Sequence, residues 1–104
     1  MMPPLYRLAI MSVGSLTILI ALPGCKTLKD KRSRIRPILA RLHRQFNVAT
    51  AETASQDSLK EAILTVVGVS NERPQVEREL QSVLAFVADS WPDSPVLDYR
   101  IQFF

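Results

Sequence analysis

The chain has 104 residues, of which 47% are hydrophobic and 22% charged, a composition that predicts one folded domain around one core. It holds one Cys and one His, which excludes an internal disulfide framework and a conventional structural zinc site. Its net charge of +3 hides an asymmetry. Residues 1–46 carry nine basic residues and one acid, +8, whereas residues 47–104 carry four basic residues and nine acids, −5. Such asymmetry points to a polyanionic or acidic partner.

The apolar run from Leu8 to Leu22 has two interpretations. Arg7 precedes it and Leu22-Pro23-Gly24-Cys25 ends it, so it resembles a lipoprotein signal peptide, with the protein anchored through Cys25. Six cations within residues 26–36 follow directly, against the positive-inside tendency of translocated chains. Alternation of apolar residues at 16, 18, 20 and 22 instead has the period of a half-buried strand. We expect the strand and keep the lipoprotein as the alternative.

The first ten residues are expected to lie outside the folded domain. Met11 stands directly before the predicted strand and is an alternative start to Met1. Residues 1–10 are therefore expected to be an N-terminal extension that is either poorly ordered or lies before the true start of translation. Residues 11–104 are expected to form the single domain.

A helix and a short strand follow the first strand. Thr27 and Asp30 form a sequence typical of a capping box, and the apolar residues then recur at spacings of three and four, as in an amphipathic helix. These residues are Ile35, Ile38, Leu39, Leu42 and Phe46. Pro37 predicts that this helix kinks or begins only a turn before it. Small residues alternating over 47–53 predict a short strand, and residues 54–58 read as a turn.

The second half repeats the pattern. A β-branched, nearly continuous apolar run within residues 60–70 predicts a central strand. Asn71 is expected to cap a second helix with Pro74 in its first turn. Its apolar stripe comprises Val76, Leu80, Val83, Leu84 and Val87. Residues 96–103 alternate Leu97, Tyr99, Ile101 and Phe103 with polar residues, which predicts a last strand with those four facing the core. Phe104 should then point outward and invite a partner.

The predicted order is β, α, β, β, α, β. This order is the ferredoxin-like βαββαβ sandwich, an α+β fold with a four-stranded antiparallel sheet and two helices on one face. Right-handed crossovers place the first and third strands in the centre and the second and fourth at the edges.

Several short strings also resemble the YlxP-like family of small bacterial proteins over about residues 11–104. They are Leu22-Pro23-Gly24, Thr27 to Arg32, Arg41-Leu42 with Arg44, Phe46-Asn47-Val48, Ala51-Glu52, Gln56-Asp57, Val69-Ser70-Asn71 and Val96 to Tyr99. The resemblance implies a ferredoxin-like cytoplasmic protein with no established activity, whose genes lie among those for translation and ribosome maturation. Members commonly carry a His before the Gln-Asp pair and an aromatic residue soon after it, where this chain has Ser55 and Leu59.

A basic cluster at the start of the first helix is the strongest functional signal. Lysine and arginine side chains there can neutralise phosphates and release counterions, which gives salt-sensitive binding largely independent of base sequence. The predicted nucleic-acid-binding residues are Lys26, Lys29, Lys31, Arg32, Arg34, Arg36, Arg41 and Arg44. The outward residues of the first strand include no aromatic residue, so readout of single-stranded bases is not expected.

The other polar residues do not assemble a reaction centre. Glu52, Gln56 and Asp57 are expected to be ordinary hairpin-loop residues. His43 flanks the apolar stripe and is expected to be structural or solvated. Cys25 is expected to have no reactive role, and Trp91 is expected to close the second helix over the core. We predict no catalytic residues, no metal and no cofactor.

The sequence therefore predicts a cytoplasmic, non-enzymatic accessory protein that binds the backbone of RNA through its basic first helix, and the family resemblance implies that this RNA belongs to a ribosomal particle. No contact with a membrane is expected. Two alternatives remain: a homo-oligomeric protein-interaction module that associates through its edge strands without nucleic acid, and the lipoprotein anchored through Cys25.

Overall fold

The computed structural model describes residues 11–104, so the expectations for residues 1–10 lie outside the described part of the chain. Six elements follow in the order β, α, β, β, α, β. They are β1 (Ser12–Ala21), α1 (Leu28–Gln45), β2 (Ala49–Ala54), β3 (Glu61–Ser70), α2 (Arg73–Ser90) and β4 (Val96–Phe103). The second strand begins two residues later than predicted; the other elements match the expected positions closely.

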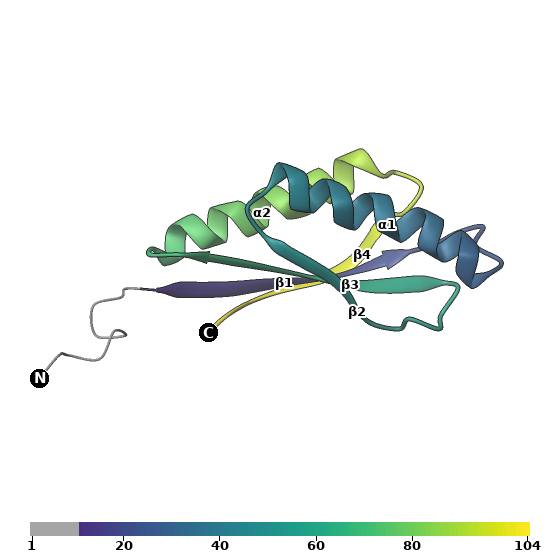
Figure 1. Ribbon diagram of the computed structural model, residues 1–104, viewed down its shortest axis with the longest axis horizontal. Coiled ribbons are helices and arrows are strands. Elements are labelled where there is room, and N and C mark those ends of the chain that lie inside the picture. The colour runs from purple at the N-terminus through teal and green to yellow at the C-terminus, as the bar shows by residue number, and fades with distance from the viewer. Residues whose placement is uncertain (1–10) are drawn as a thin grey trace, which may run out of the picture.

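The sheet has the order β2-β3-β1-β4, with every neighbouring pair antiparallel. Both helices cover one face of it and leave the other face open (Figure 1). The ferredoxin-like α+β fold is therefore confirmed, including the central position of the first and third strands. Among the residues described, no helix combines the length and apolar character needed to cross a membrane.

The first strand lies at the centre of the core, as its alternation predicts. Leu16, Ile18 and Ile20 are fully buried beneath the helices, and Leu22 follows on the same side. Each meets its partner on β3 in register, with Leu16 opposite Val66 and Ile18 opposite Leu64. From Ser12 to Ala21 the apolar run is thus a paired strand and not a separate apolar helix.

Helix α1 begins where its capping box predicts. The Thr27 hydroxyl accepts a hydrogen bond from the Asp30 amide at 3.0 Å, and the Asp30 carboxylate accepts from the Thr27 amide at 3.2 Å. This reciprocal pair satisfies amides that no helical carbonyl can reach. The helix runs through Pro37, so the expectation that it begins only a turn before that residue is wrong.

Helix α2 begins one residue later than expected. Glu72 is the N-cap and gives no side-chain cap, with Pro74 in the first turn. Instead of Asn71 capping the helix, the Ser70 hydroxyl accepts a hydrogen bond from the Glu72 amide at 3.2 Å. This difference follows from β3 continuing to Ser70, which leaves only Asn71 and Glu72 for the turn.

The last strand departs from its predicted burial. Ile101 and Phe103 pack against the core, but Leu97 and Tyr99 are 57% and 51% exposed, which corrects the expectation that all four apolar residues face inward. A register shift opposite Leu19 and Ile20 interrupts the alternation near Leu97. In addition, β4 is an edge strand, where a side chain directed to the helix layer has fewer neighbours to cover it.

Candidate nucleic-acid interface

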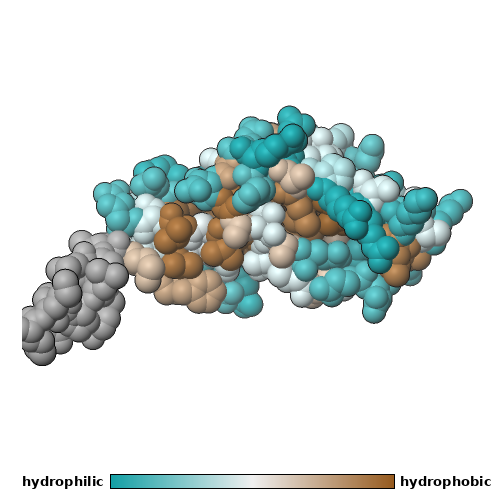
Figure 2. Space-filling view, in the orientation of Figure 1, coloured by the Kyte–Doolittle hydropathy of each residue, from teal (hydrophilic) through white to brown (hydrophobic). Residues whose placement is uncertain are grey.

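Seven of the eight predicted cations lie at the surface around α1. Lys26, just before the helix, and Lys29, Arg32, Arg36, Arg41 and Arg44 on it are exposed, and Arg34 is partly exposed. Hydrophilic side chains accordingly cover the upper part of the molecule, where the helices lie (Figure 2). The eighth, Lys31, behaves differently.

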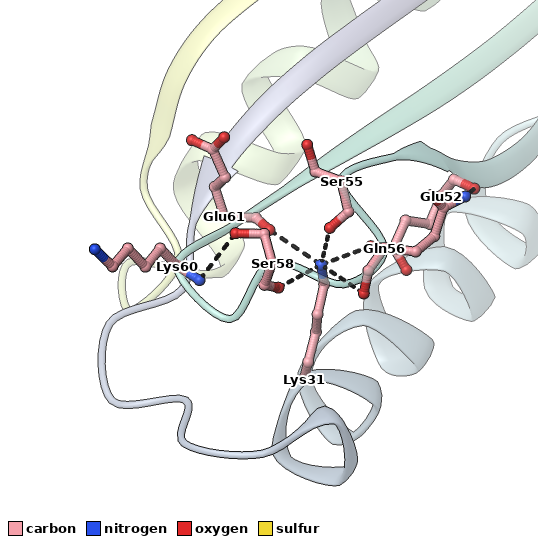
Figure 3. A network of polar contacts seen from close by, with 7 residues as sticks. All are labelled: Lys31, Glu52, Ser55, Gln56, Ser58, Lys60 and Glu61. Carbon is pink, nitrogen blue, oxygen red and sulfur yellow. Dashed lines mark hydrogen bonds and ion pairs between the residues drawn. The ribbon is translucent and has the colours of Figure 1, made fainter.

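Lys31 does not belong to the exposed basic surface. Its side chain is 2% exposed and enters the protein between α1 and the β2–β3 loop (Figure 3). A phosphate cannot reach this ammonium, so its assignment as a nucleic-acid-binding residue is corrected. The sequence contains a signal for this burial. Lys31 precedes Ile35, Ile38 and Leu42 by four, seven and eleven residues, and therefore shares their apolar stripe.

Five oxygen atoms surround the Lys31 ammonium. Four main-chain carbonyls, three in the β2–β3 loop and one at the start of β3, accept hydrogen bonds from Nζ at 2.5 to 3.3 Å, and Oε2 of Glu52 lies 2.9 Å from it (Figure 3). The four carbonyls belong to Ser55, Gln56, Ser58 and Glu61. An ammonium has three N–H donors, fewer than the oxygens around it. Glu52 Oε2 is buried and makes no hydrogen bond of suitable geometry, so its attraction to Lys31 is mainly coulombic.

The Lys31 ammonium holds the β2–β3 loop in a conformation that its sequence does not favour. Ser55 has φ of +59°, the left-handed region that residues other than glycine rarely occupy. Its carbonyl oxygen lies 2.5 Å from Nζ of Lys31, and the side-chain Nε2 of Gln56 donates a long bond to the Glu52 carbonyl at 3.4 Å. The predicted ordinary hairpin turn is thus a loop closed around a buried cation.

Glu52, Gln56 and Asp57 are brought together at this loop. With Leu28, Lys31 and Arg32 they line a small cavity of about 220 Å³. Arg32 therefore lies on the flank of α1 that faces β2. Lys29 and Arg36 stand three and four residues from it, which places all three along this one flank. Lys29, Arg32 and Arg36, named here the β2-side flank, form no ion pair within residues 11–104, where the only ion pair joins Lys31 and Glu52.

Two arginines on the opposite flank are engaged with the protein. Arg34 donates a hydrogen bond of 3.4 Å to the Asp93 carbonyl, and the Arg41 guanidinium lies 5.4 Å from the ring centre of Phe86. Such a cation–π contact holds the guanidinium against the α2 side of the helix. The free positive charge is therefore concentrated on the β2-side flank, with Lys26 and Arg44 near its ends.

The remaining side chains singled out by sequence have structural contacts. His43 Nδ1 lies 3.2 Å from the Val48 carbonyl. Trp91 is partly buried and meets Phe86 edge to face, with 5.6 Å between ring centres, which confirms its place against the core. Cys25 also packs against the core. Over the described range 11–104, no three His, Cys, Asp or Glu side chains gather to hold a metal ion.

Comparison with known proteins first gives the class of fold. A solved structure of a de novo designed protein, Foldit4, superposes with a TM-score of 0.53, covering 90% of this chain and 96% of its own at 13% identity. At that identity the likeness shows only the shared ferredoxin-like arrangement.

Sequence comparison then gives the family. The model of the family described as "Protein of unknown function (DUF503)" matches residues 13–101. A relative from Bacillus subtilis (strain 168), "Uncharacterized protein YlxP", is 38% identical over 78 residues, covering 75% of this chain and 84% of the relative. The chain therefore belongs to the DUF503 family, the YlxP-like family that its motifs predicted.

Proposed function

We propose that this protein binds the phosphate backbone of structured RNA through the β2-side flank of α1 and acts by binding, without catalysis. The observation that supports this is the row formed by Lys29, Arg32 and Arg36, three exposed cations on one helix flank with no acidic partner in the described chain. Their spacing along about two turns of helix presents them together to a polyanion.

Backbone contacts fit this surface better than readout of bases. Proteins of this fold that read single-stranded RNA stack bases on aromatic side chains of the open sheet face. Here the outward residues of β1 are Val13, Ser15, Thr17 and Leu19, none of them aromatic, and the exposed aromatic Phe104 follows the edge strand β4 and does not lie on a central strand. Recognition by the shape and charge of a folded RNA is the mode that remains.

The family resemblance supplies the expected source of the RNA. The resemblance implies that genes of this family tend to lie among those for translation and ribosome maturation, and on that ground we propose a ribosomal particle in the cytoplasm as the partner. Anchoring as a lipoprotein is disfavoured physically, because cleavage before Cys25 would remove β1. The core would then lose Leu16, Ile18 and Ile20, which are fully buried.

A salt titration with a matched pair of variants tests the proposal. The probe is a labelled RNA hairpin of about twelve base pairs, because double-stranded RNA is bound through shape and phosphates. If three phosphates are neutralised, affinity should fall roughly 15- to 40-fold between 50 and 200 mM salt, by the counterion-release relation for about three contacts. The triple variant Lys29→Gln/Arg32→Gln/Arg36→Gln should lose most of the affinity and of the salt dependence.

The control variant removes the same charge elsewhere. Lys60→Gln/Arg73→Gln/Arg78→Gln also neutralises three exposed cations and should keep the affinity of the wild type within about threefold, since only long-range attraction is changed. Glutamine is used because reversal at Arg32 would place a third carboxylate beside Glu52 and Asp57. Equal losses in both triples would show dependence on net charge alone and would refute the site. Co-sedimentation with ribosomal particles at the same two salt concentrations tests the proposed source.

A further inference from the structure

The face of the sheet opposite the helices carries apolar side chains among polar ones and has no cover within the described chain. The register places its side chains in rows that run across β3, β1 and β4. From one end of the strands to the other, the rows are Ile63, Leu19 and Asp98; Thr65, Thr17 and Arg100; Val67, Ser15 and Gln102; and Val69, Val13 and Phe104. Ala49 and Ala51 of β2 continue the face beyond β3. We call this surface the open face.

Phe104 protrudes from one end of the open face. Phe103 lies opposite Gly14 and packs against the core, so alternation directs Phe104 to the other side of the sheet. Its amide donates to the Val13 carbonyl at 2.9 Å, which fixes the main chain there. The Phe104 side chain is nevertheless 79% exposed, and the chain end marked C in Figure 1 lies on the side of the sheet away from the helices.

A hollow lies on the same face near the other end of β4. Its volume is about 460 Å³, and its lining consists of Thr17, Leu19, Ile63, Asp98, Tyr99 and Arg100. The aliphatic residues lie toward the centre of the sheet, and the charged pair lies at its β4 edge. One molecule therefore carries both a projecting aromatic side chain and a concave, partly apolar site on one surface.

We propose that the open face binds a second copy of this chain, with Phe104 of each copy seated in the hollow of the other. The two copies are related by a two-fold axis that lies in the plane of the interface, runs perpendicular to the strands and passes at the level of Leu16. This rotation places the row that contains Phe104 over the row that contains Asp98 in the second copy. The same axis superposes the row of Gln102 on the row of Arg100, where the amide oxygen can accept from the guanidinium. The same rotation therefore places each Phe104 over the hollow of the other copy, so that the two contacts are identical, as an isologous interface requires.

The charge of the open face excludes the partner proposed for α1. Its four rows hold one acid and one base, Asp98 and Arg100, and none of the α1 cations. One arginine gives RNA little positive charge to bind, whereas a second copy of the same face, which carries no net charge, fits. Pairing through the edge of β4 is also disfavoured, because Asp98 Oδ1 accepts the Tyr99 amide at 2.8 Å and so occupies a donor that an added strand would need.

The size of the open face predicts a weak dimer. Four strands and four rows span about 20 Å by about 25 Å, or about 500 Å² on each copy and about 1,000 Å² in total. That is near the lower limit for a specific interface. We therefore expect dissociation constants of about 10 to 100 μM, and a dimer that presents its two α1 helices on opposite outer sides.

Sedimentation equilibrium of the full chain without RNA tests this inference. Between about 10 and about 500 μM, a range chosen to bracket the expected affinity, the average mass should rise from 11.7 kDa toward twice that value. Phe104→Ala should weaken association at least about tenfold, and Ile63→Lys, which places a charge inside the contact, should abolish it. Leu28→Ala removes another exposed apolar side chain, on α1, and should leave association unchanged.

Circular dichroism should show that each variant remains folded, because the side chains of Phe104 and Ile63 point away from the core. A monomer over the whole range would overturn the inference, whether the face is bare or binds a different protein. A dimer that tolerates both Phe104→Ala and Ile63→Lys would overturn it as well, because the contact would then lie elsewhere, for example along the edge strands. Neither result bears on RNA binding by α1.

Discussion

Nζ of Lys31 lies 2.9 Å from Oε2 of Glu52, across the gap between α1 and the second strand. Both atoms are buried, although the Glu52 side chain as a whole keeps 20% of its surface exposed. The pair joins the helix to β2, and the same ammonium also binds carbonyls 24 to 30 residues further along the chain, from Ser55 in the β2–β3 loop to Glu61 at the start of β3. A cation in this position acts as a structural link.

Lys31→Met should destabilise the protein strongly. Methionine matches the length of the side chain but leaves four carbonyls without their donor and the Glu52 carboxylate without its positive partner. Removing one partner of a buried ion pair costs about 3 to 5 kcal/mol, a large part of the about 5 to 15 kcal/mol that stabilises an ordinary domain. Urea unfolding followed by circular dichroism should show a midpoint lowered accordingly.

Lys29→Met is the matched control, two residues away on the exposed side of the same helix. It should change the free energy of unfolding by less than about 0.5 kcal/mol. If Lys31→Met were equally mild, the buried lysine would not hold the loop.

Glu52→Gln should be tolerated better than the loss of the lysine. The ammonium keeps its four carbonyl acceptors, and the amide oxygen of glutamine can still face Nζ. We expect a loss of about 1 to 2 kcal/mol, in the range for weakening one buried charged contact. The same urea titration measures it. A loss as large as that of Lys31→Met would contradict the view that the carbonyls supply most of the coordination.

Two paired glycines offer a test of how closely α2 packs on the sheet. Gly14 and Gly68 lie opposite each other on β1 and β3, but only Gly14 is tightly covered. A Cβ at Gly14 would lie 2.8 Å from Val76 Cγ1, whereas at Gly68 the nearest atom is Glu79 Oε1 at 3.5 Å. Gly14→Ala should therefore cost about 1 to 3 kcal/mol through overpacking.

Gly68→Ala serves as the control and should be neutral within about 0.5 kcal/mol. Thermal unfolding separates the two, because about 1 kcal/mol shifts the midpoint of a domain of this size by about 4 to 8 °C. Equal shifts for both alanines would mean that the helix moves to accommodate either side chain.

Local patterns were sufficient to predict the fold. The alternation of Leu16, Ile18 and Ile20 predicted a central strand, and Thr27 with Asp30 predicted the start of α1. Both signals arise between residues only a few positions apart in the sequence, so they can be read without knowledge of the tertiary structure. The β4 burial was predicted wrongly since alternation does not reveal a register shift or how far the helices extend over an edge strand. Leu97 and Tyr99 are exposed for those reasons.

The candidate site was predicted only in part. Counting charge grouped Lys31 with Lys29 and Arg32, but helical geometry separates them: Lys31 lies on the stripe of Ile35 and Ile38, and the others lie outside it. Its acceptors are main-chain carbonyls 24 to 30 residues away. Every residue has a main-chain carbonyl, so the sequence does not indicate which of them bind the ammonium. The left-handed conformation of Ser55 was likewise hidden, because serine does not mark that conformation as glycine would.

The capping box of α1 should give the protein a small, defined acid sensitivity. Asp30 accepts hydrogen bonds from the amides of Lys26 and Thr27 at 3.1 and 3.2 Å. These bonds, led by that from Lys26, hold the pKa of the Asp30 carboxyl below its usual value. Because this pKa is lower in the folded than in the unfolded protein, the unfolded chain takes up the proton first as the pH falls. The stabilisation is therefore complete above the unfolded pKa and is lost as the pH falls through the folded one.

Asp30→Ala should accordingly lower the melting temperature at neutral pH, and its difference from the wild type should shrink below about pH 4, where an ordinary aspartate begins to be protonated. Melting curves of both proteins between pH 7 and pH 3 measure this convergence. Thr27→Ala removes the other half of the capping box, at a cost of about 1 kcal/mol. Because the Thr27 hydroxyl also helps to lower the Asp30 pKa, its difference from the wild type should shrink in acid too, but by less than that of Asp30→Ala, since the bond from the Lys26 amide remains. If the Asp30→Ala difference did not change with pH, the carboxylate charge would contribute nothing to the cap.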